Sequence, residues 1–200
     1  MMPQKKIELN ETTREAWLES AIEIFRSELF KRLGFKIPSN VRVSIGLPGG
    51  SRNSKKAIGQ CWNSKATIDN YISIFISPVL DDSARVLDVL AHELVHAVLD
   101  CKGGHGPQFR RIATAIGLEG PMRATHAGTE LANYIKGMIS QLGNIPHARL
   151  NLLMNPVKKQ TTRMVKMECE ECGYIARASR KYIDERGAVI CPCNGSAMHL

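Results

Sequence analysis

The chain has 200 residues, 44% of them hydrophobic, which is enough to bury a core and excludes wholesale disorder. Lys and Arg number 27 against 19 Asp and Glu, and the resulting formal net charge of +8 favours an acidic partner. No run of 18 apolar residues exists and the N-terminus lacks the apolar part of a secretory signal, so we expect a cytoplasmic protein without a membrane partner.

The elements expected in the first half of the chain are one helix and a set of short strands. Residues 12–33 repeat apolar side chains at helical spacing, with Asn10 or Thr12 as the N-cap. Alternating or β-branched runs then predict three strands, at 41–45, 58–62 and 72–77.

The clearest helix of the chain is expected at 82–100, with Asp81 or Asp82 as its N-cap and a pair of glycines after its end. Two further helices are predicted at 107–116 and 129–142, each ending at a glycine.

The helix at 82–100 contains the sequence HELVH, which is an HExxH motif. Residues four apart share one face of a helix, so His92 and His96 can bind the same metal ion. Glu93 is then rotated away from the metal but can reach a water beside it and take its proton. The pattern therefore predicts a zinc site that activates water.

A catalytic zinc needs a third protein ligand and an open fourth position. His105 follows His96 by nine residues, after a glycine pair that can turn the chain back towards the helix. A carboxylate from a later helix is the alternative, with Glu130 the better candidate and Glu119 the weaker.

Four of the six cysteines form two close pairs, Cys169 with Cys172 and Cys191 with Cys193. Such pairs, separated by the length of a β-hairpin, predict a Cys₄ zinc ribbon, and a reducing compartment favours metal binding over disulfides. Cys61 and Cys101 are expected to be small core residues.

HELVH followed by GHGPQF resembles the SprT-like metalloprotease family. The resemblance implies that His92, His96 and His105 bind the catalytic zinc and that Glu93 is the general base. It also implies that Phe109 packs the helix that follows.

The expected fold is α+β. A minimal zincin-like metalloprotease domain, with an N-terminal helix, a small three-stranded sheet, the HExxH helix and further helices, precedes a small β zinc ribbon. The predicted boundaries are 1–150 for the SprT-like domain, 151–165 for a basic linker and 166–200 for the ribbon, with two zinc ions, one catalytic and one structural.

DNA is the expected acidic partner, because the SprT-like family acts on proteins bound or crosslinked to DNA. Residues 101–167 contain 10 basic and only 2 acidic side chains, although a solvated surface can have the same composition. Non-sequence-specific or single-stranded DNA is expected to contact basic side chains of the linker and ribbon: Lys158, Lys159, Arg163, Lys166, Arg177, Arg180 and Lys181.

Tyr174 and Tyr182 can stack on unpaired bases or pack the ribbon. An extended substrate is expected to pair with an edge strand, for which 72–77 is the candidate.

The resulting hypothesis is a monomeric, DNA-associated zinc endopeptidase that cleaves DNA-bound proteins. Its alternatives are a gluzincin-like peptidase with a glutamate as third ligand, and a non-catalytic DNA-binding or transcription-associated zinc protein.

Overall fold

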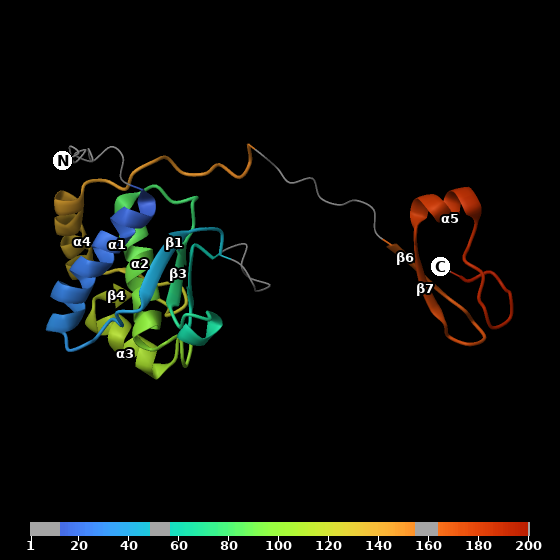
Figure 1. Cartoon of the computed structure of the whole chain (residues 1–200), viewed down its shortest axis with the longest axis horizontal. Coiled ribbons are helices and arrows are strands. Elements are labelled where there is room, and N and C mark those ends of the chain that lie inside the picture. The colour runs from blue at the N-terminus through green and yellow to red at the C-terminus, as the bar shows by residue number, and fades with distance from the viewer. Residues whose placement is uncertain (1–12, 49–56, 155–163, 200) are drawn as a thin grey trace, which may run out of the picture. The chain divides into compact units, whose positions relative to one another are not determined.

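The computed structural model describes residues 13–48, 57–154 and 164–199, and the chain separates into two units, Met1–Leu152 and Leu153–Leu200 (Figure 1). Helices and small sheets make up the first unit, as expected for the α+β class. Asn10, Thr12, Lys158, Lys159 and Arg163 lie outside the described residues. No helix in the described ranges is both long and apolar enough to cross a bilayer.

The N-terminal helix is α1 (Arg14–Ile24), which continues without a break as the π-helix η2 (Phe25–Phe30). Thr13 is its N-cap, since its Oγ1 accepts a hydrogen bond of 3.1 Å from the backbone N–H of Ala16. The apolar side of both segments is buried in the core, as Trp17, Leu18 and Phe25 show.

The three-stranded sheet consists of β1 (Val41–Ile45), β2 (Gly59–Trp62) and β3 (Ile72–Ile76), in the order β1-β3-β2. β3 pairs in parallel with β1 and antiparallel with β2. The expectation that 72–77 is an edge strand is therefore wrong. Its isoleucines at 72, 74 and 76 are all buried, and such an apolar strand belongs in the middle of a sheet with neighbours on both sides.

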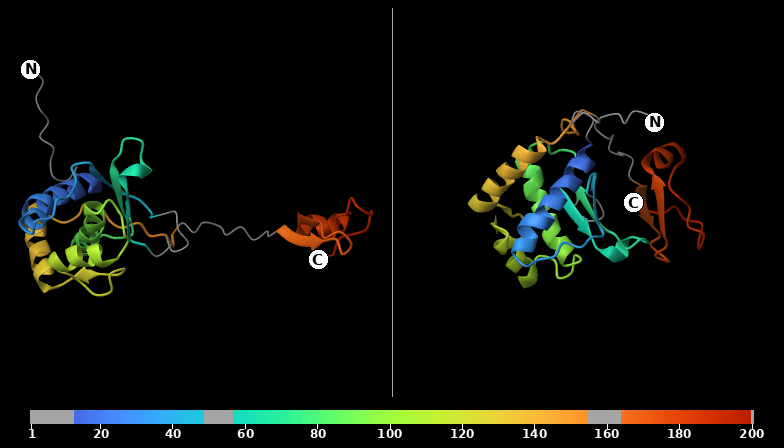
Figure 2. Two further views of the ribbon diagram at one scale, coloured as in Figure 1. Left: turned by 90° about the horizontal axis from the view of Figure 1, so that it is seen from below. Right: turned by 60° about the vertical axis from the view of Figure 1, so that its left-hand side comes forward.

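The HExxH helix is α2 (Ser83–Val98), which begins where Asp82 accepts a 2.7 Å hydrogen bond from the N–H of Arg85. It lies against β2 and β3 on one side and against α3 (Pro107–Ala115) and α4 (Thr129–Leu142) on the other. The helices gather on one side of the sheet (Figure 2). The connection from α3 to α4 holds a two-stranded ribbon of β4 (Leu118–Glu119) and β5 (His126–Ala127).

The segment after α4 returns along the first unit. The indole N–H of Trp17 donates to the carbonyl of Gly143 at 3.1 Å, and the N–H of Leu150 donates to the carbonyl of Pro78 at 2.8 Å. These bonds hold the segment after α4, as far as Leu150, against the first unit.

The second unit is built on a hairpin of β6 (Met164–Glu168) and β7 (Ile175–Ser179), followed by the short helix α5 (Arg180–Arg186). β6 begins inside the segment expected as linker. The C-terminal residues return to the hairpin, where Glu168 and His199 form an antiparallel bridge. Among the described residues of this unit, 153–154 and 164–199, the buried core consists of Met167, Met198, Cys169 and Cys191.

Candidate active site

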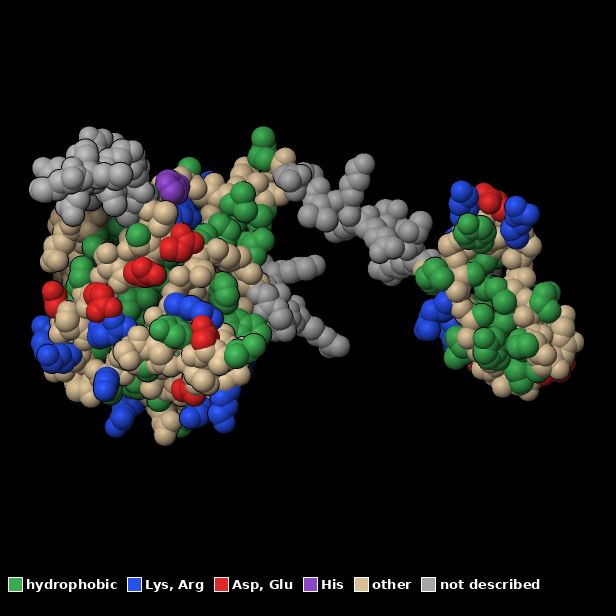
Figure 3. Space-filling view, in the orientation of Figure 1, with side chains coloured by type: hydrophobic (Ala, Val, Ile, Leu, Met, Phe, Trp, Pro, Cys, Tyr) green, Lys and Arg blue, Asp and Glu red, His purple; other side chains and the backbone are tan. Residues whose placement is uncertain are grey.

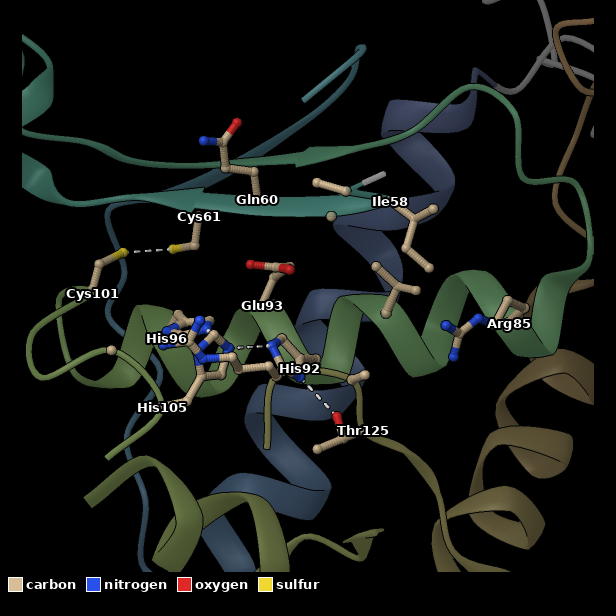
Figure 4. Close-up of a pocket in the computed structure, with 16 residues that line it drawn as sticks. Ile58, Gln60, Cys61, Arg85, His92, Glu93, His96, Cys101, His105 and Thr125 are labelled. Carbon is tan, nitrogen blue, oxygen red and sulfur yellow. Dashed lines mark hydrogen bonds between the residues drawn. The ribbon is translucent and has the colours of Figure 1, made fainter. Parts of the chain in front are cut away.

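Three imidazoles converge beside α2. His92 and His96 stand one turn apart on the helix, and Nε2 of His105 lies 3.2 Å from Nε2 of each (Figure 4). Nitrogen ligands about 2.0–2.1 Å from a tetrahedral zinc lie about 3.3–3.4 Å from one another. The three nitrogen atoms therefore fit around one zinc ion.

The turn after α2 places His105. Gly103 and Gly104 have φ angles of 73° and 52°, in the left-handed region that favours glycine, with no atom near their missing Cβ positions. The N–H of Gly106 then donates to the carbonyl of Gly103 at 3.1 Å, and Pro107 begins α3. The glycines thus reverse the chain and the next helix holds the imidazole in place.

Phe109 of α3 packs directly against the imidazoles. Its ring centroid is 4.9 Å from those of His92 and His105 and 4.5 Å from that of His96, and its side chain is buried. The aromatic ring therefore contacts all three imidazoles and restricts their movement, in addition to packing its own helix.

Thr125 orients the first histidine. Its Oγ1 lies 2.8 Å from Nδ1 of His92, so an N–H at Nδ1 can donate to the hydroxyl and leave Nε2 free to bind metal. Single-sequence reasoning missed this residue, because it lies in an irregular segment before β5 with no motif to mark it.

The histidines are neutral at physiological pH. Burial, followed by the charges of His105 and Arg85, lowers the pKa of His92 to about 4. Burial and its two histidine neighbours lower the pKa of His96 to about 3, and burial also lowers that of His105. Neutral imidazole is the form that binds a metal ion.

Glu93 lies beside this cluster in a cavity of about 650 Å³ between α2 and β2. Its carboxylate points towards β2 and is only 6% exposed (Figure 4). Burial, helped by the charge of Cys101, raises the pKa of Glu93 to about 8. A carboxyl that titrates near neutrality can both accept and donate a proton there.

No carboxylate of the described residues joins the three imidazoles. Glu119 in β4 and Glu130 in α4 are exposed and lie outside the cluster. The geometry therefore favours His105 over either glutamate as the third ligand.

Cys61 and Cys101 fit the expectation of small core residues only in part: Cys61 packs against the core while remaining partly buried, and neither cysteine joins a candidate metal cluster of the described residues. Both are half-buried and line the cavity, with their Sγ atoms 3.0 Å apart. The edge position of β2 and the turn after α2 bring them there, and no local pattern in the sequence signals that pairing. Arg85 and Arg123 also line the cavity and were missed for the same reason.

The four ribbon cysteines form a second candidate metal centre. Sγ of Cys169 lies 3.8 Å from that of Cys193, and Sγ of Cys172 lies 3.5 Å from that of Cys191. Thiolates about 2.3 Å from a tetrahedral zinc lie about 3.8 Å apart. Backbone N–H groups of Cys172 and Glu171 lower the pKa of Cys169 to about 7, which favours the thiolate that zinc requires.

The candidate DNA contacts within the described residues are exposed on the ribbon. Lys166 and Arg177 face each other across β6 and β7, while Arg180 and Lys181 belong to α5. Lys166 also pairs with Glu168 at 2.6 Å.

Tyr174 and Tyr182 are likewise exposed, at 51% and 64%, rather than packed in the ribbon. Apolar side chains cover much of the ribbon face drawn in Figure 3, with basic ones beside them.

Comparison with known proteins bears on the first unit. Neither the curated proteins nor the solved structures contain a match to the chain. The sequence profile of the SprT-like family matches residues 18–129, which include the HExxH helix, His105 and Thr125. Because this match covers more than half of the sequence, the chain belongs to the SprT-like family of zinc metalloproteases.

Proposed function

We propose that the protein is a zinc-dependent endopeptidase that cleaves proteins associated with DNA. The proposal rests on one observation. Three imidazole Nε2 atoms are spaced as the nitrogen ligands of one zinc ion are, and they lie next to a buried glutamate in one open cavity. A structural zinc site has no need of a cavity or of a buried base.

His92, His96 and His105 would hold the zinc, while Thr125 and Phe109 keep the rings in position. Bound zinc supplies Lewis acidity to a peptide carbonyl and to water. Glu93 accepts the proton of the attacking water and returns it to the departing amine.

The substrate chain is proposed to pair with β2, the edge strand beside the cavity, instead of with residues 72–77. β2 forms one wall of the cavity through residues 59–61 and pairs with β3 alone among the described strands. An extended peptide beside β2 would pass over Glu93 and the histidines.

The association with DNA rests on charge. Within the described ribbon, residues 164–199, five basic side chains are balanced by five acidic ones, whereas residues 101–153 contain six basic and two acidic side chains. The first unit is therefore expected to contribute much of the phosphate contact, and the exposed ribbon tyrosines contribute base stacking.

The decisive experiment uses the variant Glu93→Gln. It should retain zinc, because Glu93 is outside the ligand cluster, yet lose cleavage of a DNA-binding protein presented on single-stranded DNA. Elemental analysis and a gel assay of the same samples, with and without DNA, measure both quantities, and two zinc ions per chain are expected. Unchanged proteolysis would refute the role of Glu93. Salt-sensitive DNA binding with no cleavage by the wild type would instead identify a non-catalytic zinc protein.

The third ligand is tested separately. His105→Ala should lose one zinc per chain and Glu130→Gln should lose none, as measured by elemental analysis. The reverse result would identify a gluzincin-like site.

A further inference from the structure

We propose that Cys61 and Cys101 are an oxidation site, at which a peroxide converts the two thiols into a disulfide that slows proteolysis. The formation of the bond stands on the geometry of the two cysteines, and its effect on cleavage rests on the function proposed above.

The two thiols are in contact although 40 residues separate them in the chain. Their Sγ atoms lie 3.0 Å apart, and a disulfide bond is about 2.05 Å long, so closure requires a movement of about 1 Å. Two zinc-bound thiolates would lie farther apart, at about 3.8 Å. The described residues near this pair also offer no third ligand that would complete a metal site.

The pair is accessible to a small oxidant. Both cysteines line the open cavity beside Glu93 and are half-buried rather than sealed in the core (Figure 4). A peroxide that enters the cavity reaches the thiols without unfolding the unit.

The backbone of the turn holds Cys101 in place for this contact. Asp100 and Cys101 have backbone φ angles of 48° and 55°, which residues other than glycine seldom adopt. Two hydrogen bonds fix this turn. Oδ1 of Asp100 accepts a 2.8 Å bond from the backbone N–H of Ser64. The backbone N–H of Cys101 donates to the carbonyl of His96, also at 2.8 Å. The first bond joins the turn to the segment that directly follows β2, so both thiols are held by one connected piece of structure.

The reaction balances with one equivalent of peroxide. One thiol sulfur attacks a peroxide oxygen, the O–O bond breaks, and a sulfenic acid and one water are formed. The second sulfur then attacks the sulfenic sulfur, the S–S bond forms and a second water leaves. Two thiols are oxidised by two electrons, and hydrogen peroxide is reduced to two molecules of water.

The bond would tie together two walls of the active site. Cys61 belongs to β2, and Cys101 lies in the turn between His96 and His105. β2 already lies so close to α2 that a Cβ at Gly59 would be 2.6 Å from Oε1 of Glu93. Closing the disulfide would draw β2 about 1 Å closer to the turn after α2, which leaves less room for Glu93 and for the substrate. A displacement of about 1 Å in an active site lowers the reaction rate by up to about a hundredfold.

The test treats the full-length, zinc-loaded protein with hydrogen peroxide, blocks remaining thiols and maps the tryptic peptides. Cys61 falls in the peptide 57–65 and Cys101 in 86–102, whereas the ribbon cysteines fall in 167–177 and 187–200. We expect 57–65 linked to 86–102, and cleavage activity about tenfold or more lower, restored by dithiothreitol.

Cys61→Ser and Cys101→Ser are the matched controls, and neither should show the linked peptides or a peroxide-dependent, dithiothreitol-reversible loss of activity. Absence of the 57–65/86–102 link in the wild type would overturn the proposal. A link without any change in cleavage would overturn its regulatory part. If the wild type never cleaves, the proposed function fails, while the linked peptides and a rise in melting temperature still report on the disulfide.

Discussion

The imidazole cluster shows how much of this site depends on single side chains outside the motif. The HExxH motif supplies two candidate ligands. The orientation of the His92 ring, however, is fixed by the contact between its Nδ1 and Oγ1 of Thr125, and Phe109 contacts all three imidazole rings. A hydrogen bond to the outer nitrogen of a metal-binding histidine fixes its tautomer and orientation. The metal affinity of this site therefore depends on residues that take no part in coordination.

Thr125→Val tests this dependence. The valine has nearly the same shape but cannot accept the Nδ1 proton of His92, so zinc affinity at the histidine site should fall by about 10- to 100-fold. Competition with a chromophoric chelator measures it, and Thr125→Ser is the control that retains the hydroxyl. Equal affinities for the valine and serine variants would contradict the orienting role.

At the scale of elements, the close approach of β2 to α2 is what forms the cavity. Gly59 allows it, because a Cβ there would lie 2.6 Å from Oε1 of Glu93 and from Cγ1 of Val89. Glycine here provides space, since its φ angle is not in the left-handed region.

Gly59→Ala should therefore destabilise the first unit by about 1–3 kcal/mol, the usual range for overpacking, and lower its proteolytic activity. Gly137→Ala is the matched control: it lies inside α4 with no atom within 4 Å of its Cβ position, and should stabilise by about 0.5–1 kcal/mol. Urea unfolding measures both, and two changes of the same sign would refute the argument.

The contact between α4 and η2 predicts a pH dependence. Tyr134 donates to Oε2 of Glu28 at 3.3 Å, and burial, followed by the charge of Glu28, raises the pKa of Tyr134 to about 12. Unfolded tyrosine titrates near pH 10, so the folded state holds this proton more tightly. The protonated Tyr134 phenol therefore contributes fully to the free energy of unfolding below about pH 10, and this contribution is lost as the pH rises towards 12.

Urea midpoints at pH 9 and pH 11 provide the measurement. The wild type should lose more stability between the two values than Tyr134→Phe, which has no phenol to titrate. Identical losses would show that this contact has no influence on stability.

For the whole molecule, the two units differ in what holds them together. The first buries an extensive core from α1, η2, the sheet, α2 and α4, whereas the second buries two methionines and two of its cysteines. A unit with so small a core depends on its metal for most of its stability.

Removal of zinc by a strong chelator should thus unfold the ribbon and leave the first unit folded but inactive. Hydrogen exchange should show loss of protection in residues 164–199, with protection retained in α1, α2 and β3. Retained protection of the ribbon after complete zinc removal would contradict a structural role for the Cys₄ site.

The sequence alone determined what depends on spacing along the chain. The extents of β1 and α4, the HExxH helix and the four-cysteine ribbon follow from local periodicity and motif spacing, and the family resemblance rests on the same residues. A helix face is a local property, so the pairing of His92 with His96 needed no tertiary information.

Only the tertiary structure decided which strand borders the cavity, which residue orients His92, and that Cys61 meets Cys101. Strand order, the position of an irregular segment and the meeting of residues 40 apart are set by how separate elements pack in one core. No local pattern encodes such packing, because its energy comes from contacts between segments that are distant in the chain.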